Sequence, residues 1–168
     1  MKKAVWCLLV LAFIPMMIFP LSTDHFEEEF RKSFDFFWEQ ANSIPGSVGY
    51  GLVRDRYPAS ADCASIASTG FGLSAIVIGV EKEWITYEQG AERAEKTLDT
   101  LLKMETVRGF FYHFVDISTA QRINKSEIST IDTAILLCGA LTCAKYFGGE
   151  ILSKTMMLFS EINWKVFV

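Results

Sequence analysis

The sequence predicts an all-α protein in which helices with one wet face alternate with helices that are apolar all round. Three segments, 24–42, 87–104 and 150–162, carry apolar residues every three or four positions with charged residues between them, the pattern of an amphipathic helix. Two segments, 61–81 and 130–147, are rich in small and aliphatic residues and nearly free of charge, which predicts helices surrounded by protein. In chain order the helices are therefore outer, inner, outer, inner and outer.

This alternation favours a two-layer α/α barrel over a helical bundle. The inner ring of such a barrel touches protein on both sides, whereas a bundle gives each helix one wet face. No sequence repeat is visible at the period of the hairpins, so burial type alone carries this prediction. A closed double ring needs more helices than the five predicted here. Two alternatives follow: a small helical domain completed by a partner, or the front part of a larger barrel.

Local signals set several of the helix ends. Asp24 followed by Glu27 has the spacing of an N-cap with its reciprocal acid, and Thr86 followed by Gln89 has the spacing of a capping box. The stretch "SIPGSVGYG", residues 43–51, ends the first helix, because Pro and Gly interrupt helical structure.

The first 22 residues predict a targeting segment. Lys2 and Lys3 precede an apolar run, residues 4–21, and polar residues follow it, which is typical of a secretory signal peptide. Cleavage near residue 22 is one alternative, and an uncleaved membrane anchor is the other, because the run is about as long as a minimal membrane span. In either case residues 23–168 are expected to be exported as one domain, to the periplasm or the cell exterior.

Composition argues against several classes of function. The chain has 16 basic and 20 acidic residues and a net charge of −4, without a Lys/Arg stripe, so a nucleic-acid partner is not predicted. Cys63, Cys138 and Cys143 are irregularly spaced, which predicts free thiols rather than a disulfide framework. The two histidines, His25 and His113, have no further ligand at helical spacing, so no metal site is predicted, and no cofactor is expected.

Six stretches of the chain carry a family resemblance. They are "FDFFWEQAN" (34–42), "GLVRDR" (51–56), "SIASTGFGLSAIVIGVEKEWIT" (65–86), "AERAEKTLDTL" (91–101), "RGFFYHFVD" (108–116) and "STIDTAILLCGAL" (129–141). Together and in this order, they resemble the glycoamylase-like family of bacterial proteins, which includes endo-β-1,2-glucanases and the central domain of cyclic β-1,2-glucan synthases.

This resemblance implies an (α/α)6 barrel of the six-hairpin glycosidase type, with a carbohydrate groove at the end where the inner helices begin. It also implies that residues 23–168 are the N-terminal part of such a domain, about its first five helices, because family domains are much longer. The implied activity is glycoside hydrolysis of a β-glucan by carboxylate acid and base chemistry, with β-1,2-glucan favoured. The truncated chain itself is expected to be inactive.

Three carboxylates are candidates for that chemistry: Asp132, Asp62 and Glu127. Asp132 follows Ser129 by three residues, so it is either the reciprocal acid of a capping box or a groove carboxylate whose ionised form the helix end stabilises. Asp62 is expected at the start of the other inner helix, either as a cap or as the partner of Asp132 across the groove. Glu127, in the connection before the second inner helix, is either a solvated loop acid or a further catalytic carboxylate.

Arg54, Asp55, Tyr112 and His113 are the candidates for substrate binding. Sugars present apolar C–H faces that stack on aromatic rings and hydroxyl groups that need polar partners. The segment "RGFFYHFVDI", residues 108–117, offers both, and in the family it lies beside the groove. Arg54 and Asp55 either close on a sugar hydroxyl or pair with neighbouring charges.

The same segment also carries structural expectations. Its alternation allows a short strand in which His113 faces one way and Tyr112 the other. Phe110 and Phe114 are predicted to fill the end of the barrel.

A non-catalytic helical module at the cell envelope, binding a glucan or another protein, is the alternative function. The two functions differ in their dependence on Asp132. The substitution Asp132→Asn removes turnover from an enzyme without unfolding it, whereas a binding module is scarcely affected. The predicted partner is an oligo- or polysaccharide, and membrane contact is limited to the N-terminal segment if that segment stays uncleaved.

We expect residues 23–168 to self-associate. Neighbours cover both flanks of each inner helix in a closed ring, so a chain with five helices leaves apolar flanks of segments 61–81 and 130–147 in water. Light scattering and a dye that fluoresces on apolar surface measure this. A monodisperse monomer that melts cooperatively and binds no dye would contradict the expectation and favour a self-contained domain.

Overall fold

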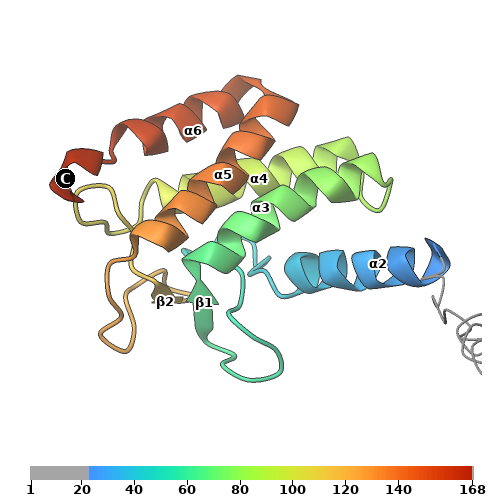
Figure 1. The fold of residues 1–168 in the computed structure, drawn as a ribbon, viewed down its shortest axis with the longest axis horizontal. Coiled ribbons are helices and arrows are strands. Elements are labelled where there is room, and N and C mark those ends of the chain that lie inside the picture. The colour runs from blue at the N-terminus through green and yellow to red at the C-terminus, as the bar shows by residue number, and fades with distance from the viewer. Residues whose placement is uncertain (1–22, 168) are drawn as a thin grey trace, which may run out of the picture. The chain divides into compact units, whose positions relative to one another are not determined.

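The computed structural model describes residues 23–167, so the predicted targeting segment, residues 1–22, lies outside the described part. The elements, in chain order, are α2 (Thr23–Glu39), β1 (Cys63–Ser65), α3 (Ile66–Glu81), α4 (Tyr87–Leu101), β2 (Phe114–Asp116), α5 (Thr130–Phe147), α6 (Gly149–Ser160) and a 3-10 helix (Trp164–Phe167) (Figure 1). The five predicted helices are therefore all present among the described residues.

Contacts divide the chain into two units, one up to Phe30 and one from Arg31 onward. In the first unit, the described residues form the first turns of α2, where the rings of Phe26 and Phe30 stack with centroids 6.0 Å apart. The second unit holds the remainder of α2 and all other elements, together with the core. Its most completely buried side chains include Leu52, Ile66, Leu73, Leu98, Leu101, Phe110, Phe111, Val115 and Leu136.

The two predicted inner helices, α3 and α5, pack against each other in the second unit, and α4 and α6 pack against this pair (Figure 1). The backbones of α3 and α5 touch at two glycines. A Cβ on Gly139 of α5 would lie only 2.0 Å from the carbonyl oxygen of Gly70 of α3. The small residues of the inner segments thus allow the two helices to pack closely.

The outer helix α4 starts with the predicted capping box of Thr86 and Gln89.

Each inner helix nevertheless leaves apolar side chains in water. Phe71 and Ile78 of α3 are 52% and 36% exposed, and Ile131 and Leu141 of α5 are 67% and 38% exposed. By length and composition α5 is, among the described residues, the one helix that could cross a membrane. Core helices meet the same criteria, and α5 packs against α3 and α6.

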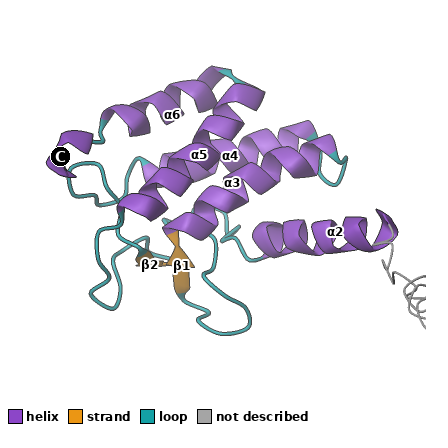
Figure 2. Cartoon of the chain, viewed as in Figure 1, coloured by secondary structure: helices purple, strands orange, loops and turns teal. Residues whose placement is uncertain are grey.

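The all-α prediction needs one addition, a small antiparallel ribbon formed by β1 and β2 (Figure 2). Its register pairs Cys63 with Asp116 and Ser65 with Phe114. The ribbon joins the loops that precede α3 and α5. The alternation in segment 108–117 allowed a short strand, and β2 forms in the C-terminal part of that segment.

The helix predicted for residues 61–81 begins later, at Ile66. Ser65 has extended backbone angles (φ −104°, ψ 137°), and its hydroxyl accepts from the amide of Ser68 at 3.4 Å, so Ser65 is the N-cap. The expectation that Asp62 stands at the start of an inner helix is therefore wrong. Pattern alone missed this start because a short apolar run fits a buried strand as well as the first turn of a buried helix.

The two inner helices begin with the same arrangement of bonds. In α3, the Thr69 hydroxyl donates to the carbonyl of the N-cap Ser65 at 3.0 Å and accepts from the Val53 amide at 3.1 Å. The Ser65 amide donates to the Val53 carbonyl at 3.2 Å. Since Thr69 is fully buried, its single hydroxyl ties the loop at Val53 to the first turn of the helix.

In α5 the same roles belong to Ser129, Thr133 and Phe111. The Thr133 hydroxyl donates to the Ser129 carbonyl at 2.7 Å and accepts from the Phe111 amide at 3.0 Å. The Ser129 amide donates to the Phe111 carbonyl at 3.0 Å. A repeat that is not visible in the sequence is therefore present in the hydrogen bonding.

The correspondence extends to one further pair of residues. The Asp55 amide donates to the Cys63 carbonyl, and the His113 amide donates to the Glu127 carbonyl, each at 2.9 Å. We call residues 31–81 the first hairpin and residues 87–147 the second hairpin. Asp55 and Cys63 of the first hairpin are the counterparts of His113 and Glu127 of the second.

We expect Gly139→Ala to lower the free energy of unfolding by about 1 to 3 kcal/mol, the usual cost of overpacking. Alanine has the higher helix propensity by about 1 kcal/mol, so a loss comes from the clash with Gly70. Urea unfolding followed by circular dichroism measures the change, and Cys138→Ala, at the exposed neighbouring position, is the control. Equal stability of the two variants would contradict the close approach of α3 and α5.

Candidate functional site

Three of the predicted site residues, His113, Glu127 and Asp132, lie together at the N-terminal end of α5. Nδ1 of His113 is 2.8 Å from Oε1 of Glu127, and Nε2 of His113 is 3.9 Å from Oδ2 of Asp132. One imidazole ring thus stands between two carboxylates. We call these three residues the His113 cluster.

Asp132 lies in the first turn of α5. Its amide donates to the Ser129 hydroxyl at 3.2 Å, so Ser129 is the N-cap, as predicted. The Ser129 amide bonds to the Phe111 carbonyl, which leaves the Asp132 carboxylate without the reciprocal capping role. That carboxylate, 10% exposed, lies within 3.9 Å of the His113 ring instead. The positive end of the helix dipole lies beside it.

Both the backbone and the ring of His113 are held in place. The His113 amide donates to the Glu127 carbonyl at 2.9 Å, and the His113 carbonyl accepts from the Ile66 amide at 3.1 Å, which links the starts of both inner helices. The imidazole stacks on the Phe114 ring with centroids 3.7 Å apart and an interplanar angle of 20°. Since the side chain is still 30% exposed, part of the ring remains accessible.

Glu127 is the exposed member of the cluster, with 68% of its side chain accessible. Its pKa lies below the ordinary value, first because its own backbone amide donates to the carboxylate and second because the His113 ring does. At a pH above the pKa of Glu127 in the unfolded chain, this lowered pKa stabilises the fold. The contribution is lost as the pH falls through the pKa of Glu127 in the folded chain. Glu127 is therefore anionic at neutral pH, which suits a base or an orienting group.

The aromatic segment divides between the core and the cluster. Phe110 and Phe111 are 1% and 2% exposed and belong to the core, which confirms the prediction for Phe110. Phe114 is half-buried, and its ring stacks on the imidazole of His113. The prediction that Phe114 fills the end of the barrel misses this contact.

Tyr112 is buried on the other side of this segment. Its hydroxyl donates to the Glu105 carboxylate at 3.4 Å, and the Arg122 guanidinium lies 4.6 Å over its ring. Tyr112 and His113 therefore have separate partners, Glu105 and Arg122 for Tyr112 and Glu127 for His113. Substrate binding by Tyr112 stays a prediction, because the structure does not bring its ring to the His113 cluster.

Asp62, Arg54 and Asp55 belong to the first hairpin, and their partners differ from those of the cluster. The Arg54 guanidinium donates to the Gln40 side chain at 3.0 Å, and Asp55 accepts from Arg56 at 2.7 Å. Asp62 is exposed in the turn before β1. Asp55 thus pairs with a neighbouring charge, whereas Arg54 bonds to the neutral Gln40, and contact of either residue with a sugar stays a prediction.

Thr133, which fixes the aromatic segment to α5, was not among the residues predicted from the sequence. Its signal is a threonine four residues after the N-cap serine, in "SIAST" (65–69) and in "STIDT" (129–133). A hydroxyl at that spacing reaches the cap carbonyl and can still accept a hydrogen bond from another segment.

The described cysteines and acids form neither a metal site nor a disulfide. Among residues 23–167, no group of three or more His, Cys, Asp or Glu side chains is placed to hold a metal ion. Cys63, Cys138 and Cys143 are free. Burial raises the pKa of the Cys143 thiol to about 12, so it is an unreactive core residue.

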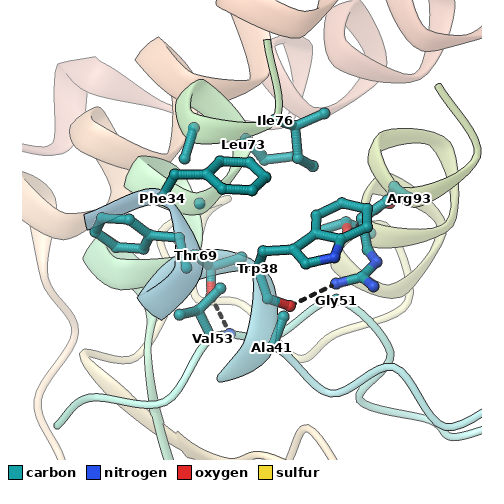
Figure 3. Close-up of a pocket in the computed structure, with 13 residues that line it drawn as sticks. Phe34, Trp38, Ala41, Gly51, Val53, Thr69, Leu73, Ile76 and Arg93 are labelled. Atoms are coloured by element: carbon teal, nitrogen blue, oxygen red, sulfur yellow. Dashed lines mark hydrogen bonds between the residues drawn. The ribbon is translucent and has the colours of Figure 1, made fainter. Parts of the chain in front are cut away.

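The pocket in Figure 3 is a gap between packed elements, not a sugar site. It lies between α3, α4 and the part of α2 that belongs to the second unit, and it encloses about 10 Å³, room for roughly one water molecule. Arg93 donates to the Trp38 carbonyl at 3.2 Å on one side, and the Val53–Thr69 bond crosses the other (Figure 3). A sugar ring does not fit there.

The chain forms helical hairpins with a carboxylate at the start of an inner helix. Comparison with solved structures shows that this fold is similar to that of glucoamylase-like proteins. A structure described as a glucoamylase candidate from Bacteroides uniformis matches with a TM-score of 0.74 and 29% identity, over 82% of this chain and 35% of that one. A β-1,2-glucanase from Parabacteroides distasonis matches with a TM-score of 0.73 and 28% identity, over 82% of this chain and 20% of that one.

Among characterised proteins, the chain is similar to an exo-β-1,2-glucooligosaccharide sophorohydrolase (non-reducing end) from Parabacteroides distasonis. The two are 33% identical over 125 residues, which are 70% of this chain and 16% of that protein. No protein-family model matches the chain. These matches confirm the resemblance to the glycoamylase-like family and the partial α/α-barrel fold, and the chain spans only part of the length of these relatives.

We expect Thr133→Val to lower the free energy of unfolding by about 1 to 3 kcal/mol, because it leaves the buried Phe111 amide without an acceptor. Valine keeps the shape of threonine, so packing is little changed. Thr142→Val, which removes an exposed hydroxyl bonded to the Cys138 carbonyl in the same helix, is the control and is expected to change stability by less than about 0.5 kcal/mol. Urea unfolding of both variants measures the difference, and equal losses would contradict the anchoring role of Thr133.

Proposed function

We propose that the chain is part of a glycoside hydrolase that acts on a β-glucan, with β-1,2-glucan as the favoured substrate. The observation that carries this proposal is the His113 cluster at the start of an inner helix, in a fold similar to that of β-1,2-glucan-active proteins. Glycoside hydrolysis uses two carboxyl groups, one that protonates the leaving oxygen and one that acts as base or nucleophile.

Asp132 is the proposed base or nucleophile. Its side chain is 10% exposed against 68% for Glu127, and a catalytic carboxylate works best where water is excluded. Glu127 is proposed to orient the substrate, since its lowered pKa keeps it anionic and its exposed oxygens can accept from sugar hydroxyls. Asp62, the partner predicted from the sequence, stands before β1 rather than at a helix start.

The proton donor is proposed to come from another part of the barrel. An imidazole ring occupies the space between Asp132 and Glu127, so a sugar ring cannot lie between these two carboxylates. The relatives are much longer than this chain, which covers 35% of one solved relative and 20% of another. A groove with two walls therefore requires helices beyond the five described here.

A glucan-binding module without catalysis is the second candidate. The observation that favours it is the same partial coverage, because one wall of a groove can bind a sugar without holding the second catalytic group. We also propose that the protein is exported. The support for export is the basic start at Lys2 and Lys3, followed by the apolar residues 4–21.

We expect the full chain to bind a β-1,2-linked glucooligosaccharide and to hydrolyse little or none of it, because the five described helices supply only one wall of the proposed groove. Asp132→Asn is expected to weaken binding about tenfold, since a hydrogen bond to a charged group is worth about 1.5 kcal/mol or more. Calorimetric titration measures binding, release of reducing sugar measures turnover, and a β-1,4-linked oligosaccharide of equal length is the control.

Two outcomes would overturn parts of this proposal. Turnover that disappears in Asp132→Asn would contradict the expected inactivity of the chain while supporting Asp132 as a catalytic residue. Binding that is equal for both linkages and unchanged in Asp132→Asn would contradict the proposed site.

A further inference from the structure

The contact between His113 and Glu127 goes beyond what the fold of the hairpin requires. Nδ1 of His113 is 2.8 Å from the Glu127 carboxylate, in addition to the backbone bond between the same two residues. In the first hairpin the counterparts Asp55 and Cys63 keep the backbone bond at 2.9 Å. Their side chains have other partners, because Asp55 accepts from Arg56. The turn therefore forms without a bond between the two side chains.

The surroundings of the His113 ring fix which nitrogen carries the proton toward Glu127. An ionised carboxylate only accepts hydrogen bonds, so the bond at 2.8 Å requires a proton on Nδ1. The stack on Phe114 holds the ring plane, and Asp132 lies on the Nε2 side at 3.9 Å, too far for a direct hydrogen bond. The ring thus makes one hydrogen bond, to Glu127.

The bond to His113 restricts the Glu127 carboxylate, which also accepts from its own backbone amide. Its side chain is 68% exposed, and a free glutamate in water samples many rotamers, so a partner is needed to hold it in one of them. Arg122 is the nearby cation, but its guanidinium donates to the carbonyls of Ser126 and Lys125 and lies over Tyr112. The charge of Arg122 also lowers the pKa of Glu127, but less than the two hydrogen bonds do.

We propose that His113 is a positioning residue, whose Nδ1–H holds the Glu127 carboxylate in a fixed place across the ring from Asp132. This inference rests on the proposed function, in which Glu127 orients the sugar for reaction at Asp132. It changes the role expected from the sequence, where His113 itself was a sugar-binding candidate. The ring lies between the two carboxylates, stacks on Phe114, and directs its hydrogen bond to Glu127.

Two substitutions separate the two ring nitrogens. The amide nitrogen of asparagine takes the place of Nδ1, and that of glutamine takes the place of Nε2. In His113→Gln the pKa of Glu127 is expected to rise toward the ordinary value for glutamate, because the second cause of its lowering is lost. In His113→Asn the pKa of Glu127 is expected to stay low.

The measurement is the ¹³C chemical shift of the Glu127 carboxyl against pH in the full chain, without any sugar present. An unchanged Glu127 titration in His113→Gln, or equal titrations in the two variants, would overturn the proposal. Because no glucan is involved, this result is independent of whether the proposed function holds. Circular dichroism of both variants shows whether the fold is intact.

A second measurement covers the case in which the His113 variants do not fold. Glu127 is exposed and lies in a loop, so Glu127→Ala leaves the core untouched. In that variant the ¹⁵N shifts of the His113 ring are expected to move, whereas those of His25, the other histidine of the chain, stay constant. Unmoved His113 shifts would also overturn the proposal.

Discussion

A single hydroxyl, that of Thr133, joins the aromatic loop to the first turn of α5. It accepts from the Phe111 amide at 3.0 Å and donates to the Ser129 carbonyl at 2.7 Å, and it is fully buried. A buried amide without an acceptor costs about 1 to 3 kcal/mol, so this bond is strongly preferred over an open loop. With Phe111 fixed, His113 is fixed two residues later, and the bond between the Ser129 amide and the Phe111 carbonyl frees the Asp132 carboxylate from capping.

The first hairpin uses the same bonds with different side chains at the critical positions. Thr69 holds Val53 as Thr133 holds Phe111, while the positions of His113 and Glu127 are taken by Asp55 and Cys63. The scaffold is thus repeated and the chemistry is not. This separation explains why the cluster occurs once among the described residues although the hairpin occurs twice.

The helices could be predicted because each carries its own signal. The capping box of Thr86 and Gln89 and the apolar periodicity of residues 87–104 depend only on local sequence. The start of α3 could not be predicted, because residues 63–65 become a strand only through pairing with distant β2. The members of the His113 cluster were predicted one by one: Asp132 at a helix start, Glu127 in the connection before it, and His113 in the aromatic segment. Their contact depends on the Thr133 bond and on the stack with Phe114, and neither leaves a periodic pattern.

Hydrogen exchange at the Phe111 amide measures how firmly the aromatic loop is tied to α5, because this amide belongs to a loop by sequence but bonds to Thr133 in the structure. We expect the Phe111 amide to exchange only when the whole domain unfolds, as slowly as the core amides of α5 and the corresponding Val53 amide. Exchange of the Phe111 amide at the rate of an open loop, while α5 stays protected, would contradict this expectation.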